Sequence, residues 1–351
     1  MTPPPIESAG VGEVGAAPRA SPRVGVRIAG TGHHVPEGVL TNEDLAKVMD
    51  TSDEWIVQRT GIRERRICNP SKGETPTWLA TRALEKALAD AHLSGADLDM
   101  VILATVTGEM TCPATACRVA ANVGAGHAAA FDLLAACSGF LYGMVVAHDM
   151  IRAGTFGTIG LIGCDVLSRV LDFDNRAVAV LFGDSAGAAV IRVTDDTSKG
   201  LITGAMHADG ARWHDLYLPR SPFDCPPETD PGSVRMNALQ MNGREVYKFA
   251  VGTFSDVIAS TLEQAGVRAE EVDMFVCHQS NARMLESARR RFGIPEEKMY
   301  VNIDRFGNCS AGSVPVAFDE LRERGACREG DLVMFVAFGG GLTWSAALWR
   351  L

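Results

Sequence analysis

No Cys-x-x-Cys pair occurs in the 351-residue sequence, and its nine cysteines are an odd number. Both observations argue against a disulfide framework and a thiolate zinc site, so we expect free thiols, no bound metal and a reducing, cytoplasmic location. Basic residues do not dominate either, because 33 Lys and Arg stand against 43 Asp and Glu, a formal net charge of −10. This balance argues against a general nucleic-acid binder and against binding to an anionic membrane.

Further absences narrow the class of protein to which the chain can belong. The most apolar stretch, residues 133–147, is too short to cross a bilayer. Residues 1–22 lack the basic start and apolar centre of a secretion signal, and their Pro, Ala and Gly content predicts a disordered extension. No P-loop and no dinucleotide-binding glycine pattern is present. We therefore expect no nucleotide-type redox cofactor.

What the sequence does contain is an alternation of strands and helices, beginning near Arg23. Helices are predicted at residues 45–50 (after a cap at Thr41), 79–92 and 138–153, and apolar strands at residues 100–106, 131–136, 157–165 and 177–193. The helix over 138–153 is apolar nearly all round and should lie in the core. The alternation predicts an α/β fold with layers.

An internal repeat indicates that the chain is built from two copies of one α/β unit. Asp99 and Asp273 lie 174 residues apart, each between a helix-and-loop segment and an apolar strand. Cys137 and Ala311 share that offset, and a third pair of segments agrees to within one residue. A repeat of this length predicts two similar halves. We place them at residues 23–195 and 196–351.

Cys137 is the first candidate for chemistry, because it lies where an apolar strand meets the buried helix. A helix N-terminus favours a thiolate, which is the nucleophilic form of cysteine. The following Ser-Gly permits close approach of another backbone. Buried cysteines are also commonly inert, so from its own residues Cys137 can be either a nucleophile or a core side chain.

Three further candidate sites, two polar residues and one glycine-rich segment, follow in the second half of the chain. His278 comes after the strand MFVC and is either a site residue or a hydrogen-bonded core histidine. Asn308 follows Gly307 and either projects into a site or makes an ordinary Asx turn. Residues 338–341 (FGGG) follow another strand, so a backbone is pressed against a ligand or a neighbouring helix.

Taken together, these segments resemble the β-ketoacyl-acyl carrier protein synthase III family of the thiolase superfamily. The match extends from about Arg23 to Leu351 and rests on TSDEWIVQRTGIRERR (51–66), AACSGF, LFGDSAGAAV, HQSNARM, GNCSAGS and FGGGLTW. The resemblance implies a duplicated, thiolase-like, five-layered αβαβα fold and a homodimer. It also implies condensation of an acyl-coenzyme A starter with malonyl-acyl carrier protein, at the start of fatty acid synthesis, without a bound cofactor.

The resemblance also implies a role for particular residues. Cys137 would carry the acyl group, His278 and Asn308 would hold the malonyl thioester oxygen, and the N–H groups of Cys137 and Gly340 would form an oxyanion hole. The residues that it implies for coenzyme A binding are Trp55, Arg59, Arg176 and Asn281. Those implied for the acyl tunnel are Cys112, Phe182 and Phe338, and Asn281 would line the tunnel as well. Those implied for binding the carrier protein are Lys248, Arg283, Arg290 and Arg291. Cys112 stands where the family often has a Phe that caps the partner subunit's tunnel.

Two other functions remain open at this point. An enzyme that loads or transfers an unusual acyl group in polyketide or other natural-product biosynthesis would show the same catalytic motifs. A non-catalytic scaffold could keep the fold, although Cys137, His278 and Asn308 are all present. The sequence does not specify the acyl starter or a role for residues 1–22.

Overall fold

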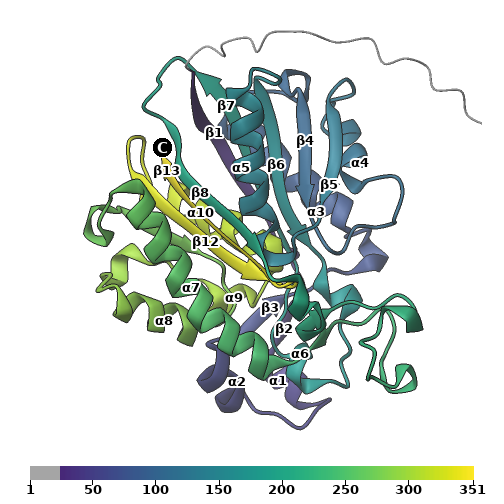
Figure 1. The fold of residues 1–351 in the computed structure, drawn as a ribbon. Helices are drawn as coiled ribbons and strands as arrows, with labels where there is room; N and C mark the ends of the chain where they lie inside the picture. Colours follow the sequence, from purple (N-terminus) through teal and green to yellow (C-terminus); the bar gives the residue numbers. More distant parts are fainter. Residues whose placement is uncertain (1–23) are drawn as a thin grey trace, which may run out of the picture.

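The computed structural model describes residues 24–351, so the extension predicted at residues 1–22 lies outside the described part. Two sheets form the centre of the molecule (Figure 1). The first has the order β1 (Gly25–His34), β7 (Ser185–Thr194), β6 (Thr158–Asp165), β4 (Met100–Ala104), β5 (Ala129–Leu133). The second has the order β11 (Met274–Cys277), β12 (Leu332–Gly339), β13 (Thr343–Arg350), β8 (Gly200–Ala208).

Helices pack on both outer faces and between the sheets (Figure 1). The longer ones are α3 (Pro76–Asp90), α4 (Thr115–Asn122), α5 (Gly139–Arg152), α7 (Gly243–Ala265), α8 (Ala282–Arg291) and α10 (Ser313–Glu323). Helices α3 and α4 cover the first sheet, α7 and α8 cover the second, and α5 with α10 fills the space between. This is the predicted five-layered α/β arrangement.

Short elements gather near the ends of the strands. They are α1 (Asn42–Ala46), α2 (Asp53–Thr60), α6 (Arg176–Ala179), α9 (Ile303–Phe306) and the two-stranded pairs β2 (Val39–Thr41) with β3 (Glu64–Arg66) and β9 (Leu216–Tyr217) with β10 (Gln240–Met241). None of the helices within residues 24–351 is long and apolar enough to cross a membrane.

The repeat seen in the sequence reappears as equivalent elements in space. Strand β4 and strand β11 begin 174 residues apart, and so do β6 and β12. The same offset relates α5 to α10, and the short 3₁₀ turns before them, η3 (Ala136–Ser138) and η10 (Ser310–Gly312). Both turns begin with a positive φ, 47° at Ala136 and 49° at Ser310. The repeat therefore includes an unusual backbone conformation as well as the order of the elements.

Two predicted elements differ from the structure. The stretch 177–193, predicted as strand throughout, contains the end of α6 and then β7, because the Asn175 side chain accepts a hydrogen bond from the Ala177 N–H and starts a helical turn. The helix predicted at 45–50 is α1 instead, since Thr41 caps it and it ends at Ala46. Helix ends are set by such local caps more than by apolar spacing.

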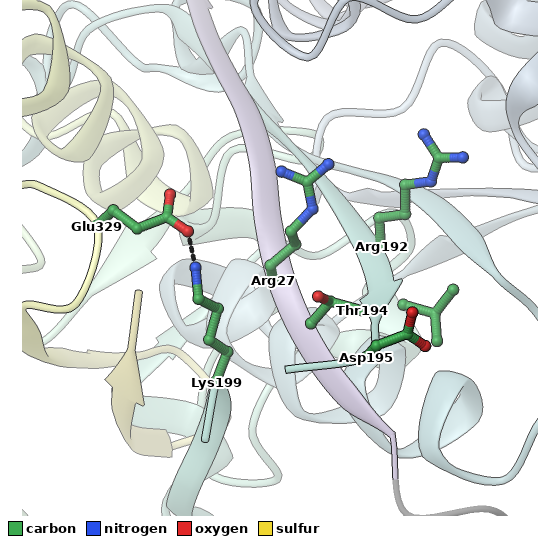
Figure 2. Close-up of a pocket in the computed structure, with 7 residues that line it drawn as sticks. Arg27, Arg192, Thr194, Asp195, Lys199 and Glu329 are labelled. Atoms are coloured by element: carbon green, nitrogen blue, oxygen red, sulfur yellow. Dashed lines mark ion pairs between the residues drawn. The ribbon is translucent and has the colours of Figure 1, made fainter. Parts of the chain in front are cut away.

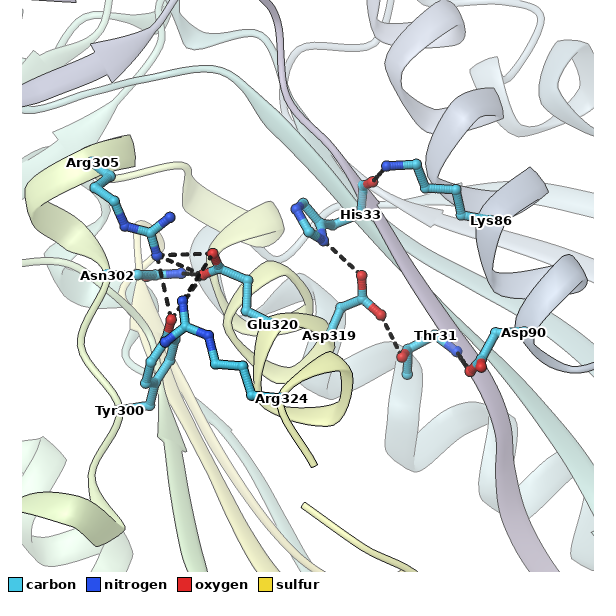
Figure 3. A network of polar contacts seen from close by, with 10 residues as sticks. All are labelled: Thr31, His33, Lys86, Asp90, Tyr300, Asn302, Arg305, Asp319, Glu320 and Arg324. Carbon is cyan, nitrogen blue, oxygen red and sulfur yellow. Dashed lines mark hydrogen bonds and ion pairs between the residues drawn. The ribbon is translucent and has the colours of Figure 1, made fainter. Parts of the chain in front are cut away.

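Helix α10 lies in the core although it carries two adjacent carboxylates, and each is paired (Figure 3). Asp319 accepts a hydrogen bond from Thr31 Oγ1 at 2.5 Å and lies 2.6 Å from His33 Nδ1, both in β1. Glu320 accepts from Asn302 Nδ2 at 2.7 Å and pairs with Arg305 at 2.8 Å. Buried charges require such partners. The pairs attach α10 to the N-terminal half on one side and to the C-terminal half on the other.

Candidate active site

Cys137 lies at a sharp turn between the first sheet and the buried helix. Strand β5 ends at Leu133, η3 covers Ala136–Ser138 and α5 begins at Gly139. The positive φ of Ala136 costs a non-glycine residue roughly 1–3 kcal/mol, and strain of this kind is often kept at functional sites. Cys137 therefore lies at the end of the first sheet, and only 7% of its surface is exposed.

Burial and the helix terminus act in opposite directions on the pKa of this thiol. Withdrawal from water raises the pKa of Cys137 to about 12, although a hydrogen bond with Ser310 lowers it. A helix N-terminus stabilises a nearby anion by about 0.3–2 kcal/mol, whereas burying an ion costs several kcal/mol. Burial favours the protonated thiol, and the expectation that the α5 terminus favours the thiolate stays a prediction.

Alkylation of Cys137 by iodoacetamide should become faster by about tenfold per pH unit between pH 7 and pH 10. The thiolate is the reacting form, and its fraction rises in this way below the pKa. Peptide mass mapping after timed exposure would follow Cys137 beside the exposed Cys112 and Cys117, which show that the reagent is active at each pH. A Cys137 rate that levels off below pH 8 would reveal a preformed thiolate.

His278 comes directly after β11 and is 1% exposed. Its backbone N–H donates to Val336 O at 2.8 Å, and its ring Nδ1 lies 2.6 Å from Ser313 Oγ. The ring stands edge-on to Phe338, with centroids 5.5 Å apart. Burial lowers the pKa of His278 to about 3. The imidazole is therefore uncharged at neutral pH, and its tautomer decides whether Nε2 donates or accepts.

Asn308 is held through both its backbone and its side chain. Its N–H donates to Leu181 O at 2.8 Å and its carbonyl accepts from Gly183 N–H at 3.1 Å, which forms a bridge beside Phe182. Its Oδ1 accepts from Ser310 N–H at 2.9 Å. Because the amide oxygen is occupied, the NH₂ group is the part of Asn308 left to donate.

The glycine-rich loop brings the end of β12 onto the cysteine turn. A Cβ at Gly339 would lie 2.6 Å from the backbone nitrogen of Cys137, so this approach requires glycine. Thr343 Oγ1 joins the two segments through contacts of 3.0 Å with both Ala135 O and Gly340 O. Within residues 24–351 the N–H groups of Cys137 and Gly340 donate no backbone hydrogen bond. Such N–H groups suit an oxyanion hole.

The two phenylalanines predicted for the acyl tunnel are buried in different surroundings. Phe338 packs between the rings of His278 and Phe254, at centroid distances of 5.5 and 5.8 Å. Phe182 belongs to an apolar cluster with Leu167, Leu171, Val178 and Leu239. Phe182 is thus part of a packed apolar cluster and Phe338 lies beside the imidazole, and their place in an acyl tunnel stays a prediction.

The residues predicted for coenzyme A come together around α2, which contacts Arg176 from α6 and Asn281 from the start of α8. The Cζ atoms of Arg59 and Arg176 lie 4.6 and 4.7 Å from the centre of the Trp55 ring. Asn281 caps α8 and its Nδ2 donates to Arg59 O at 2.9 Å, which joins α8 to α2. Two guanidinium groups beside one indole offer stacking and phosphate binding together.

Cys112 is exposed in its own chain, whereas Cys137, His278 and Asn308 are buried. Cys112 lies in the loop between β4 and α4, where Thr111 Oγ1 accepts from Arg220 Nη1 at 2.9 Å. An exposed side chain does not line a tunnel within its own subunit. The predicted gate therefore requires a second subunit and stays a prediction.

Three of the four residues predicted to bind the carrier protein are already paired with carboxylates. The pairs are Lys248 with Glu245 at 2.5 Å, Arg290 with Glu286, and Arg291 with Asp256 at 3.5 Å. Exposed pairs add little stability, but each carboxylate cancels part of the local positive charge. Arg283 is exposed and makes no ion pair within the described chain. Of the four residues, Arg283 is the strongest remaining candidate for binding the carrier protein.

A hollow of about 570 Å³ lies at the other end of the first sheet (Figure 2). Its lining residues are Arg27, Arg192, Val193, Thr194, Asp195, Lys199 and Glu329. It contains neither a cysteine nor a histidine, and Lys199 is paired with Glu329. We therefore locate the chemistry at the Cys137 turn, although that turn is closed around its thiol.

One cluster within residues 24–351 has the composition of a metal site. His33, Asp319 and Glu323 bring one nitrogen and two carboxylates within 4.8 Å of one another. Asp319, however, uses one oxygen for Thr31 and the other for His33. Because these groups satisfy each other, the cluster has a structural explanation that needs no ion.

Three residues with hydroxyl side chains contact the site but were not among the residues predicted from the sequence. Ser313 contacts His278, Ser310 supports Asn308, and Thr343 joins the glycine-rich loop to the cysteine turn. A signal was available, because these residues lie within the motifs GNCSAGS and FGGGLTW.

Comparison with known proteins gives a consistent result. Residues 131–210 match the family model for 3-oxoacyl-[acyl-carrier-protein] synthase III, and residues 262–351 match the model for its C terminus. β-Ketoacyl-[acyl-carrier-protein] synthase III of Caldanaerobacter subterraneus subsp. tengcongensis is 43% identical, over 93% of this chain and 98% of its own.

Two solved structures extend the comparison to the fold. The synthase III from Aquifex aeolicus superposes with a TM-score of 0.85 and 41% identity, over 93% of this chain and all of its own. The priming β-ketosynthase of the R1128 polyketide pathway superposes with a TM-score of 0.87 and 32% identity, over 95% and 98%.

The fold and the site together define a condensing acyltransferase with the duplicated thiolase-like architecture. The chain belongs to the β-ketoacyl-[acyl-carrier-protein] synthase III family. The family and the fold class predicted from the sequence are thereby confirmed.

Proposed function

We propose that this protein starts fatty acid synthesis by joining the acyl group of an acyl-coenzyme A to malonyl-acyl carrier protein, with loss of CO₂. What supports the proposal is that a thiol, an uncharged imidazole and an amide with an occupied oxygen all contact the turn at residues 310–313. Cys137 and His278 follow the strands β5 and β11, and Asn308 follows the short helix α9. The backbone N–H groups of Cys137 and Gly340 donate no backbone hydrogen bond within residues 24–351. Neither step is a net oxidation or reduction, so we propose no redox cofactor.

The first step is acyl transfer to Cys137. The sulfur attacks the thioester carbonyl carbon of acyl-coenzyme A, the bond from that carbon to the coenzyme A sulfur breaks, and the thiol proton leaves with coenzyme A. The N–H groups of Cys137 and Gly340 hold the oxyanion that forms in between. Since burial favours the protonated thiol, its proton moves during the attack rather than before it.

The second step is decarboxylation and condensation. The bond between the malonyl carboxylate and its α-carbon breaks, CO₂ leaves, and the electron pair forms an enolate. The donors of His278 and Asn308 stabilise the enolate oxygen. The enolate carbon then attacks the acyl-Cys137 carbonyl, the carbon–sulfur bond breaks, and the released thiolate takes up a proton. The product is a β-ketoacyl carrier protein.

Intact-protein mass spectrometry tests this proposal. The protein is mixed with a panel of acyl-coenzyme A thioesters, and malonyl-acyl carrier protein is then added. We expect one acyl adduct on Cys137 that disappears as a β-ketoacyl carrier protein forms. Failure of every acyl-coenzyme A to leave an adduct or to give product would refute the proposal.

A second candidate is a priming enzyme of a polyketide pathway, favoured by the TM-score of 0.87 to the R1128 priming β-ketosynthase. Identity favours the fatty acid enzymes, at 43% for the Caldanaerobacter protein against 32% for the priming enzyme. The same acyl panel separates the two, if the malonyl group is offered on carrier proteins of fatty acid and of polyketide type. A preference for the polyketide-type carrier would favour the second candidate.

We also propose a homodimer. Strand β5 is the edge of the first sheet, and Leu134, directly after it, is 77% exposed. An edge strand next to an exposed apolar side chain is a ready surface for a second copy. Light scattering at micromolar concentration should give twice the mass of the chain, and a monomer there would contradict the proposal.

The free cysteines support a reducing, cytoplasmic location, which cell fractionation would test.

Reversal of charge at Arg283 should weaken the carrier protein specifically. Acyl carrier proteins are acidic, and Arg283 forms no ion pair with a carboxylate of residues 24–351. Arg283→Glu should raise KM for malonyl-acyl carrier protein about tenfold, the equivalent of about 1.4 kcal/mol, with a much smaller change in acyl-coenzyme A loading. Arg290→Glu is the matched control, because Arg290 is already paired with Glu286. Equal KM values for the two variants at low salt would contradict this assignment.

Cys112 should influence the length of the acyl starter if it faces the partner's tunnel. A small side chain there leaves room for additional methylenes, each worth roughly 0.8 kcal/mol when buried. Butyryl, octanoyl and branched starters should therefore compete well with acetyl, and Cys112→Phe should shift preference toward acetyl. The measurement is product mass from competing acyl-coenzyme A mixtures. Acetyl as the only substrate, with no response to the substitution, would contradict the gate.

A further inference from the structure

The hydroxyl of Ser313 meets three polar groups but has only one proton to donate. Its oxygen lies 2.6 Å from His278 Nδ1 and 3.0 Å from Ser310 O, and it accepts from Gln279 N–H at 3.4 Å. The proton therefore goes either to the imidazole or to the carbonyl. Since the ring is uncharged, donation to Nδ1 requires the ring proton to be on Nε2, and donation to the carbonyl leaves that proton on Nδ1.

Two observations favour donation to the imidazole. The contact with Nδ1 is the shorter of the two, at 2.6 Å against 3.0 Å. Ser310 O also accepts a hydrogen bond from the backbone N–H of Ser313, so it keeps a partner without the hydroxyl. Within residues 24–351, Nδ1 of His278 has no other hydrogen-bond partner.

The turn at residues 310–313 also occupies the acceptor atom of Asn308. Ser310 N–H occupies the amide oxygen of Asn308 at 2.9 Å, and Ser313 Oγ occupies Nδ1 of His278. Both acceptor atoms are directed toward residues 310–313. What remains for a ligand is an NH₂ group and, in the tautomer favoured above, an Nε2–H group. A developing enolate oxygen needs donors, and an unprotonated Nε2 would repel it.

Ser313 is presented from a rigid support. It is the first residue of α10 and is 4% exposed. The paired carboxylates of Asp319 and Glu320 attach this helix to both halves of the chain (Figure 3). A hydroxyl on an anchored helix can hold one ring orientation, as groups that support a reactive side chain must.

We infer that Ser313 is a positioning residue, whose hydroxyl donates to Nδ1 of His278 and keeps the ring proton on Nε2, so that His278 acts as a donor to the enolate oxygen. The inference rests on the proposed function, in which His278 serves decarboxylation. The hydroxyl itself touches no reacting atom.

The direct test is the tautomer of His278 in the full-length protein. Long-range ¹H–¹⁵N correlation spectra of histidine-labelled protein distinguish Nε2-protonated from Nδ1-protonated rings, and His278→Gln assigns the signal among the eight histidines. We expect the Nε2-protonated pattern in the wild type and its loss or mixing in Ser313→Ala. A wild-type ring protonated on Nδ1 would overturn the inference, whatever the activity of any variant.

Kinetics of the separate steps give the second readout. Ser313→Ala should slow malonyl decarboxylation by about 10- to 100-fold, part of the loss typical for a missing oxyanion donor, and leave acyl-coenzyme A loading within about threefold. Ser313→Thr keeps the hydroxyl and should restore most of the rate. Ser185→Ala is the matched control, because Ser185 is equally buried and its hydroxyl makes no hydrogen bond to His278.

The outcomes separate this inference from the proposed function. If His278→Ala decarboxylates normally, the proposed role of His278 is wrong. If His278→Ala fails while Ser313→Ala keeps both the wild-type tautomer and the wild-type rate, the role of His278 stands and that of Ser313 is wrong. Equal loss of both half-reactions in Ser313→Ala, without rescue by Ser313→Thr, would also count against positioning.

Discussion

Replacement of Cys137 by serine will abolish both acylation and condensation, with a loss of about 10³-fold or more in rate, as is usual when a covalent nucleophile is removed. The serine hydroxyl is a far weaker nucleophile than a thiol, and burial lowers the pKa of His278, which makes its imidazole a weak base for activating that hydroxyl. Acyl mass on the intact protein and product mass after addition of malonyl-acyl carrier protein measure the two steps.

Cys327→Ser is the control for this experiment. Cys327 is also buried, and burial raises its pKa to about 12, as for Cys137. What it lacks is the strained strand-to-helix turn and the neighbouring glycine-rich loop. Full activity in Cys327→Ser and none in Cys137→Ser would link function to position rather than to thiol chemistry. Acyl mass on another cysteine, or condensation by Cys137→Ser, would remove the basis of the assignment, and a protein that never acylates would revive the scaffold alternative.

Removal of the side chains of His278 or Asn308 should divide the reaction into its halves. His278→Ala and Asn308→Ala should each lower malonyl decarboxylation by about 10²- to 10³-fold, the usual effect of one missing oxyanion donor. Acylation should persist at a substantial fraction of the wild-type rate, because the first step uses the separate N–H groups of Cys137 and Gly340.

Burst acylation by acyl-coenzyme A and release of CO₂ from labelled malonyl-acyl carrier protein measure the two halves independently. Thr343→Ser is a suitable comparison, since it keeps the hydroxyl that joins the glycine-rich loop to the cysteine turn. If both alanine variants lost the two half-reactions to the same extent, the division of labour would be refuted.

The pattern of the chain by itself predicted the alternation of strands and helices and the duplication, while the five-layered arrangement was implied by the family resemblance. The 174-residue repeat predicted two similar halves. In the structure, β4 and β11 begin 174 residues apart in the sequence, and so do β6 and β12. This was possible because apolar periodicity and the glycines after strands act locally. The motifs around Cys137 and His278 were visible for the same reason, since each follows a predicted strand, whereas Asn308 stood out because it follows Gly307.

Local pattern was a weaker guide where a short cap competes with propensity. The segment AVAV within 177–193 has the composition of a strand, yet Asn175 starts a helical turn there. Likewise, the charges of Lys248, Arg290 and Arg291 suggested a basic face, while their side chains are paired with carboxylates. One of these carboxylates, Asp256, becomes a neighbour of Arg291 only when α7 packs against α8.

Tertiary structure alone decided the chemical state of the site. No residue near Cys137 in the sequence predicts that its pKa rises to about 12, because the rise comes from water excluded by segments distant along the chain, including Gly339. The exposure of Cys112 and the contact of Ser313 with His278 are likewise products of packing. Periodicity and caps are properties of adjacent residues, whereas desolvation and hydrogen-bond direction depend on which distant groups come into contact.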